Sequence, residues 1–156
     1  RIAGACMGAG VEIASCCDIR IAADTARFGA PIAKLGFPMA PREAQLVARV
    51  AGELTAREML LEAAVLDAPA LLARGFLSQV VPESELAATV LGRAQRICAL
   101  APQAARLNKQ TLRVFGALDV PSTAWQTLLA QAYDYADSPE HREGIDAFVS
   151  KRKPVF

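Results

Sequence analysis

The first third of the chain alternates between short apolar runs and turns of small residues. Residues 4–10 contain three glycines and lead into 11–17, where apolar positions recur at helical spacing, so a strand end, a turn and a helix are expected there. Partly alternating, β-branched residues predict short strands over 18–23 and 26–29. Three prolines and a glycine within 30–41 argue against a regular helix or central strand. This third of the chain therefore reads as mixed α and β.

From residue 42 onward, apolar positions mainly follow a helical period. Thr55 is a candidate N-cap, and an amphipathic stripe runs from Trp125 to Tyr135. Together with the first third, this pattern predicts a helix-rich α/β protein. The expected elements are helices over 42–50, 55–64 and 68–73, a strand over 76–81, and helices over 83–100, 102–115, 122–136 and 139–150.

Composition narrows the range of partners. The 156 residues carry 17 Lys and Arg against 16 Asp and Glu, a net charge of +1, which gives no broad field for nucleic acid or an anionic membrane. Charges such as Glu53 and Arg74 interrupt every apolar run before it reaches spanning length, so no membrane crossing is expected. The chain begins at Arg1 without a methionine or a polar lead-in, which suggests the latter part of something longer.

The cysteines and the histidine do not form a metal-site pattern. The cysteines are Cys6, Cys16, Cys17 and Cys98, with no C-x-x-C pair, and the single histidine, His141, is distant in sequence. We therefore expect no metal site. Free, buried thiols in a reducing compartment are the favoured interpretation, which places the protein in the cytoplasm.

The first candidate for chemistry is the glycine-rich turn before the first helix. Gly8, Ala9 and Gly10 would leave backbone N–H groups at a helix start free to face negative charge, with Glu12 in the first turn. On spacing alone, helix stabilisation by Glu12 is favoured over a catalytic base. A dinucleotide site is disfavoured because Ile13 stands where the third glycine of G-x-G-x-x-G belongs.

Several segments, taken together in order and spacing, carry a family resemblance. They are similar to the central and C-terminal signatures of the enoyl-CoA hydratase/isomerase, or crotonase, family. The match extends over nearly the whole chain. The segments are IAGACMGAGVEIA (2–14), CDIRIA (17–22), ARFGAP (26–31), ALLARGFLSQVVP (70–82), REGIDAF (142–148) and KRKP (151–154).

The resemblance implies a fold, a substrate and an assembly. The fold would be the C-terminal part of a spiral of ββα units over residues 1–82, followed by a helical oligomerisation region over 83–156. The substrate would be an acyl-CoA thioester, with coenzyme A as part of the substrate and no separate cofactor. The assembly would be a homotrimer or a dimer of trimers.

The resemblance also implies an oxyanion hole of two backbone N–H groups that stabilises a thioester enolate. The N–H of Ala9, between Gly8 and Gly10, would be the second donor, and the first would lie upstream of Arg1. Glu12 falls on the first of two glutamates that hydratases of this family use. Because the first oxyanion donor would lie upstream of Arg1, we expect residues 1–156 alone to have negligible activity.

The second of those glutamates would fall at position 32, where the chain has Ile32, which cannot exchange a proton. Two-glutamate hydration is thus in doubt, and a double-bond shift, a decarboxylation or another one-base enolate reaction becomes credible. Glu43 could supply a replacement carboxylate, although helix-start stabilisation is the more frequent role. Phe148 and Lys151 match residues near the CoA of a neighbouring subunit, with a core aromatic and a solvated charge as the equal alternative.

The predicted function is therefore an enoyl-CoA hydratase/isomerase family enzyme that uses Glu12 as acid/base. Its rival is a pseudoenzyme that binds acyl-CoA without turnover because of Ile32. A third reading is an oligomerisation module formed by the helices beyond Ser84.

Overall fold

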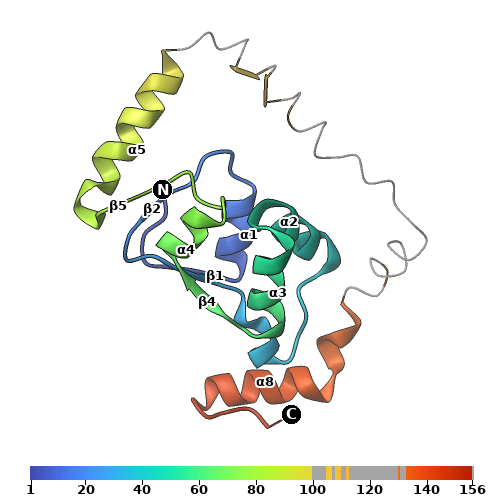
Figure 1. Ribbon diagram of the computed structural model, residues 1–156. Coiled ribbons are helices and arrows are strands. Elements are labelled where there is room, and N and C mark those ends of the chain that lie inside the picture. The colour runs from blue at the N-terminus through green and yellow to red at the C-terminus, as the bar shows by residue number, and fades with distance from the viewer. Residues whose placement is uncertain (100–104, 107, 110–111, 113–129, 131–132, 156) are drawn as a thin grey trace.

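The computed structural model describes residues 1–99, 105–106, 108–109, 112, 130 and 133–155. Its helices and strands follow one another along the chain as Figure 1 shows. The elements are β1 (Ala5–Met7), α1 (Ala9–Ser15), β2 (Ile21–Ala23), β3 (Arg27–Gly29), the 3₁₀ helix η1 (Pro31–Leu35), α2 (Pro41–Ala51), α3 (Glu53–Leu61), β4 (Val65–Asp67), α4 (Ala68–Ala73), β5 (Gln79–Val81), α5 (Glu83–Cys98), the 3₁₀ helix η2 (Asp134–Asp137) and α8 (Pro139–Val149).

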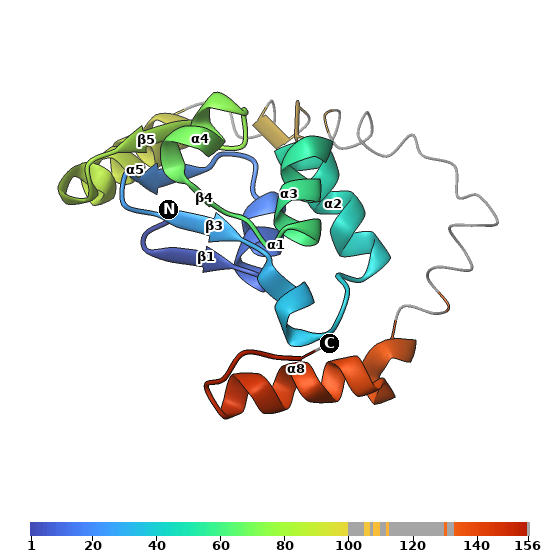
Figure 2. The ribbon, with the colours of Figure 1, turned by 60° about the horizontal axis from the view of Figure 1, so that its bottom comes forward.

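The strands form two small sheets. In one, β3 pairs in parallel with β1, where Phe28 lies opposite Cys6, and antiparallel with β4. In the other, β2 and β5 pair in parallel, with Ala22 opposite Val80. The backbone of Ile2 extends this second sheet, because its N–H and carbonyl both bond to β2. The chain therefore crosses from one sheet to the other between β1 and β2, β2 and β3, and β4 and β5, whereas β3 and β4 are neighbours in one sheet. The parallel strands β1 and β3 lie side by side in Figure 2.

The main core lies between the strands and the helices α1 to α4. Phe28 of β3 and Phe76, just before β5, are both fully buried and meet edge to face with ring centroids 6.1 Å apart. Val11 of α1, Val47 of α2 and Met59 of α3 are also fully buried in this cluster. The core therefore fixes α1 and α2 against the same strands, which matters for the site below.

Most predicted elements are present, and two details differ. The chain forms α4 over the residues expected and a helix after the glycine-rich turn. Thr55 is not a cap: α3 begins at Glu53 after Gly52, whose φ is 90°, and Thr55 is buried inside the helix. The strand β4 was not predicted. It forms because the chain turns at Ala63, with φ 54°, and then pairs with β3, a tertiary contact that a local pattern does not contain.

The expectation of buried cysteines is wrong for three of the four. Cys6 is buried, whereas Cys16, Cys17 and Cys98 are exposed, and all four are free thiols. The reason is that α1 ends at Ser15, so the adjacent pair falls beyond the helix and outside its buried stripe. Among the described residues, no helix is long and apolar enough to cross a membrane.

Two predicted helices, 102–115 and 122–136, lie largely outside the described residues, as does most of the amphipathic stripe that begins at Trp125. The segment 30–41 contains no α-helix up to Ala40; it holds the 3₁₀ turn η1, with Pro31 in its first turn and Gly36 ending it at φ 75°. That conformation is left-handed and favours glycine.

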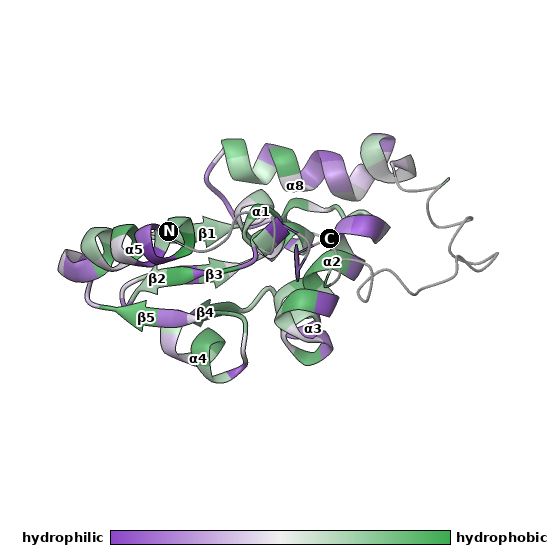
Figure 3. Ribbon diagram, turned by 90° about the horizontal axis from the view of Figure 1, so that it is seen from above, coloured by the Kyte–Doolittle hydropathy of each residue, from purple (hydrophilic) through white to green (hydrophobic). Residues whose placement is uncertain are grey.

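The helix α8 is seated directly on η1. A Cβ placed on Gly144 would lie 2.0 Å from the carbonyl carbon of Leu35, so the two backbones touch where Gly144 has no side chain. The rings of His141 and Phe37 meet edge to face beside this contact, with centroids 5.3 Å apart. Figure 3 shows α8 lying across one side of the molecule. The C-terminal helix is therefore joined to the segment that carries Ile32.

Candidate functional site

The N-terminus of α1 is held open by its backbone. Gly8 adopts φ 51° and ψ −117°, and its N–H donates to the carbonyl of Gly29 at 2.9 Å. The Gly8 carbonyl accepts the N–H groups of Val11 at 2.9 Å and Glu12 at 3.3 Å. No side chain caps the helix, and within the described part of the chain the N–H of exposed Ala9 has no acceptor. An anionic group could therefore bind this donor without displacing a bond.

The two glycines of the turn have different reasons to be there. A Cβ on Gly8 would meet nothing within 4 Å, but the positive φ disfavours any other residue. A Cβ on Gly10 would lie 3.5 Å from Sγ of Cys6, an ordinary contact, and Gly10 has no positive φ. Gly8 therefore sets the conformation of the turn, whereas Gly10 only keeps the surface small.

Glu12 lies in the first turn of α1, half-buried. Burial raises the pKa of its carboxyl, and the negative charge of Glu43 raises that pKa further. A helix N-terminus favours the ionised form, so the dipole of α1 acts in the opposite direction to these two effects. The result is a carboxyl group that accepts a proton more readily than a solvated glutamate.

Ile32 is in η1, partly buried, one residue after Pro31. It brings no proton donor or acceptor to the site. Glu43 lies in the first turn of α2, as the helix-start interpretation expects, yet it also acts electrostatically on Glu12. The structure therefore brings together Glu12 and Glu43, a pairing that the sequence pattern alone did not favour.

Phe148 and Lys151 are positioned by α8 rather than by α1. Phe148 is 69% exposed, so it is not a core aromatic in this chain. Lys151 is exposed just beyond the helix, with φ 51°. Both lie C-terminal to Gly144, the residue that seats α8 on η1.

An ion pair holds the C-terminal segment KRKP (151–154) against α8. Arg152 reaches back over α8 to Glu143, with one nitrogen 2.7 Å from the second carboxylate oxygen, and the N–H of Val155 donates to the first oxygen at 2.8 Å. These hydrogen bonds, that of Arg152 foremost, lower the pKa of Glu143 to about 2. The tail is thereby folded onto α8.

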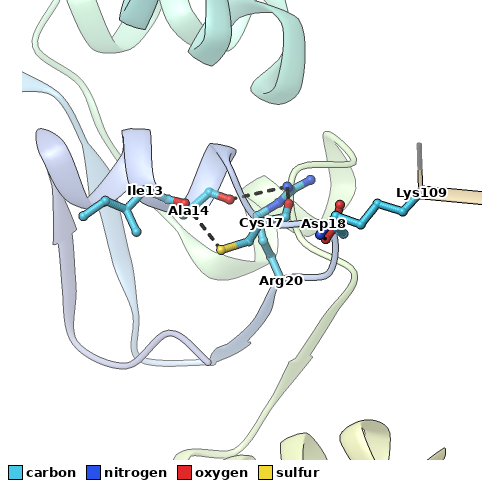
Figure 4. A network of polar contacts seen from close by, with 6 residues as sticks. All are labelled: Ile13, Ala14, Cys17, Asp18, Arg20 and Lys109. Atoms are coloured by element: carbon cyan, nitrogen blue, oxygen red, sulfur yellow. Dashed lines mark hydrogen bonds and ion pairs between the residues drawn. The ribbon is translucent and has the colours of Figure 1, made fainter. Parts of the chain in front are cut away.

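Arg20, which no sequence motif singled out, lies at the opposite end of α1. Arg20 donates from Nε to the carbonyl of Phe76. One of its terminal nitrogens donates to the carbonyls of Cys17 and Ala14, and Figure 4 draws these three residues together. Its guanidinium carbon lies 4.7 Å from the centre of the Phe76 ring. The C-terminal end of α1 is therefore closed by the N–H groups of Cys16 and Cys17, which bond to the carbonyls of Glu12, Ile13 and Ala14, and by the positive charge of Arg20, which adds a second donor to Ala14.

Beside that end, α1 and α2 share an open cavity of about 930 Å³. Ser15 and Cys16 line it from the end of α1, and Leu46, Arg49 and Val50 line it from the second half of α2. The two helices also pack directly against each other.

Comparison with known proteins places this arrangement in a family. The family described as Enoyl-CoA hydratase/isomerase matches residues 1–156. A probable enoyl-CoA hydratase of Mycobacterium tuberculosis is 34% identical over 157 residues, which cover 99% of this chain and 60% of that protein. A short-chain-enoyl-CoA hydratase of Clostridium acetobutylicum is 33% identical over 151 residues, 96% of this chain and 57% of that protein.

Solved structures agree. A methylmalonyl-CoA decarboxylase in complex with 2-nitronate-propionyl-CoA superposes with a TM-score of 0.89 at 32% identity, over 98% of this chain and 59% of that one. An enoyl-CoA hydratase/carnithine racemase from Magnetospirillum magneticum gives 0.71 at 39% identity, over 99% and 58%. The chain thus spans about three fifths of the length of these relatives. Its α/β fold is the expected crotonase fold, and the chain belongs to the enoyl-CoA hydratase/isomerase family.

Proposed function

We propose that the protein is an enzyme that acts on an acyl-CoA thioester by stabilising the enolate formed from it. The observation that carries the proposal is the uncapped start of α1, where the N–H of Ala9 has no acceptor among the described residues and lies near a half-buried Glu12 with a raised pKa. The named activities of its relatives, all on CoA thioesters, support the same substrate class.

In this mechanism the N–H of Ala9 donates to the thioester oxygen as negative charge develops on it. Gly8 sets the direction of that N–H, and Gly10 leaves room for the thioester. Glu12 moves the proton: as a carboxylate it takes one from the carbon next to the thioester, and as a carboxylic acid it returns one to the enolate. Coenzyme A is the carrier half of the substrate, and no further cofactor is needed.

A one-base reaction fits this site better than hydration by two glutamates, because Ile32 can neither bind nor activate a water molecule. In a double-bond shift, Glu12 takes a proton from the α-carbon and returns it to the γ-carbon. In a decarboxylation, the bond to the carboxylate breaks, CO₂ leaves, and protonated Glu12 delivers its proton to the enolate. The similarity to a methylmalonyl-CoA decarboxylase supports including the second reaction.

The test is Glu12→Gln in the protein expressed from its complete reading frame. The variant and the wild type are assayed on 2-enoyl-CoA, 3-enoyl-CoA and 2-carboxyacyl-CoA thioesters. We expect kcat to fall by about 10²–10⁴-fold on the productive substrate while binding of a CoA thioester persists. Glu85→Gln, in the first turn of α5 and exposed, is the matched control. Equal rates for the Glu12 variant and the wild type would remove Glu12 from the mechanism.

The alternative is a pseudoenzyme that binds acyl-CoA without turnover, which Ile32 supports. It predicts binding by calorimetry with no Glu12-dependent reaction on any of the three substrate types. Turnover above background by the wild type, lost in Glu12→Gln, would exclude it.

Assembly and location belong to the proposal as well. We infer a homotrimer or a dimer of trimers in which Phe148 and Lys151 of one subunit approach the CoA of the next, because Phe148 is exposed on its own chain. A measured mass of one chain at micromolar concentration would contradict this. The free cysteines fit a reducing compartment, so we place the protein in the cytoplasm.

A further inference from the structure

We propose that Glu43 of α2 is the positioning partner of Glu12. The inference rests on the proposed function, and it adds to the site a second carboxylate, carried by a different helix, that acts through Glu12. Its first support is the packing of α1 against α2. Ser15 and Cys16, at the end of α1, line the same cavity as Leu46, Arg49 and Val50 of α2. Glu12 and Glu43 each lie in the first turn of one of these two packed helices.

The second support is the face of α2 from which Glu43 projects. Val47 and Ala51, one and two turns further along the helix, are 0% and 1% exposed and belong to the core that also contains Val11 of α1. Residues four apart lie on one face of a helix. Glu43 is therefore on the face that meets the core, at the end where that face opens to solvent, and it is half-buried there.

The third support is the set of ionisable groups around Glu12. Besides Glu43, the ionisable groups on β1 and α2, the described elements with the most extensive packing against α1, are Cys6 and the arginines Arg42 and Arg49. Arg20 also contacts α1, at its opposite end, through the carbonyl of Ala14. Burial raises the pKa of the Cys6 thiol, so it stays uncharged. Arg42 is exposed, and Arg49 lies at the far end of α2, beside the shared cavity. Glu43 is thus the group whose charge reaches Glu12, and it raises the pKa of that carboxyl.

The chemical consequence concerns one proton. Two neighbouring carboxylates resist being ionised together, so one proton is held more tightly by the pair than by either group alone. Glu12 with Glu43 beside it is a stronger base toward the α-carbon of the thioester than Glu12 alone. The same pairing keeps a proton available for return to the enolate. Glu43 acts through Glu12 and need not touch the substrate.

The experiment compares wild type, Glu43→Gln, Glu43→Asp and the control Glu85→Gln, each from the complete reading frame, by kcat as a function of pH. We expect Glu43→Gln to lower kcat about threefold to tenfold and to move the acidic limb of the profile to lower pH, because the neighbouring charge is gone. Glu43→Asp keeps a charge and should retain most of the wild-type limb. Glu85→Gln should match the wild type.

Two outcomes would overturn the inference: no change in Glu43→Gln relative to the control, or a lower kcat with the acidic limb unmoved, which would indicate a purely structural role. Both presuppose turnover that depends on Glu12. If no thioester is turned over by the wild type, the proposed function fails and this inference falls with it. The two failures are therefore distinguishable in one set of assays.

Discussion

The two ends of the seven-residue helix α1 are treated in opposite ways. At its C-terminal end, Arg20 donates to the carbonyls of Ala14 and Cys17 (Figure 4), and its guanidinium lies over the ring of Phe76. At its N-terminal end, no side chain caps the helix, and the described residues offer no acceptor to the N–H of Ala9. Every helix has unpaired groups at both ends. Here the fold satisfies one set and leaves part of the other available to a ligand.

This difference indicates that the C-terminal end of α1 contributes to stability and that its N-terminal end is available for function. A charge-assisted contact at the closed end holds the helix in the core, so the open end can remain unsatisfied without the helix fraying. Substitutions at the closed end should change the free energy of unfolding, and substitutions at the open end should change turnover.

The largest effect on stability is expected from Arg20→Ala. This change removes the arginine donor from the carbonyls of Phe76 and Cys17 and one of two donors from that of Ala14. It should lower the free energy of unfolding by about 3 kcal/mol, measured by urea denaturation. Arg27→Ala is the matched control, because Arg27 also donates to nearby carbonyls but from an exposed position; it should cost less than about 1 kcal/mol. Equal losses for the two variants would contradict the role of Arg20 as the closing group.

Next in size is Gly8→Ala at the open end. Alanine must adopt a φ near 51° there, which should cost about 1–3 kcal/mol and misdirect the N–H of Ala9. Gly10→Ala is the paired variant. Its added Cβ finds only an ordinary contact with Cys6, so it should be neutral or stabilise by up to about 1 kcal/mol. Thermal unfolding and turnover are measured for both variants. The comparison decides whether the turn requires the positive φ of Gly8 or the absence of a side chain at Gly10.

A smaller effect of opposite sign is expected from Glu12→Gln. Because burial and Glu43 raise the pKa of Glu12 above its ordinary 4.5, the folded state binds this proton more tightly than the unfolded state. The group therefore favours folding below about pH 4.5, and that contribution is lost as the pH rises through the folded-state pKa. Glu12→Gln should unfold at higher denaturant than wild type at pH 7 and at the same concentration at pH 4. A variant less stable than wild type at pH 7 would contradict this.

The smallest effect is expected from Asp18→Asn, next to the closed end. Its carboxylate lies 2.5 Å from Nζ of Lys109, but both side chains are about half exposed. The loss should be under about 0.5 kcal/mol and should vanish at high salt. A loss as large as that of Arg20→Ala would mean that the ion pair, and not the arginine, closes this end.

Local signals predicted the elements that depend on local chemistry. The glycine-rich turn correctly predicted the helix α1. The helix α4 begins where expected, after Asp67, whose side chain accepts the N–H of Ala70. Two features could not be predicted in this way. The strand β4 exists because β3 offers it a partner, and Glu12 meets Glu43 because the core aligns two helices that are 31 residues apart at those positions. Both depend on contacts distant in sequence.

The roles of two arginines could not be predicted for the same reason, because they depend on contacts that form only in the folded chain. Arg20 and Arg152 read as surface charges in a sequence of balanced charge, yet one closes a helix and the other binds Glu143. What distinguishes them is the geometry of their acceptors, which exists only after folding.

The contact between Gly144 and Leu35 has a consequence for the register of α8. If the helix slipped by one residue, Glu143 or Ile145 would come against the carbonyl of Leu35, where even a Cβ has no space. Apolar helix faces tolerate such slips when several side chains can interchange, but a backbone contact at a glycine admits a single alignment. The absence of a side chain at Gly144 thus fixes the position of α8 along its own axis.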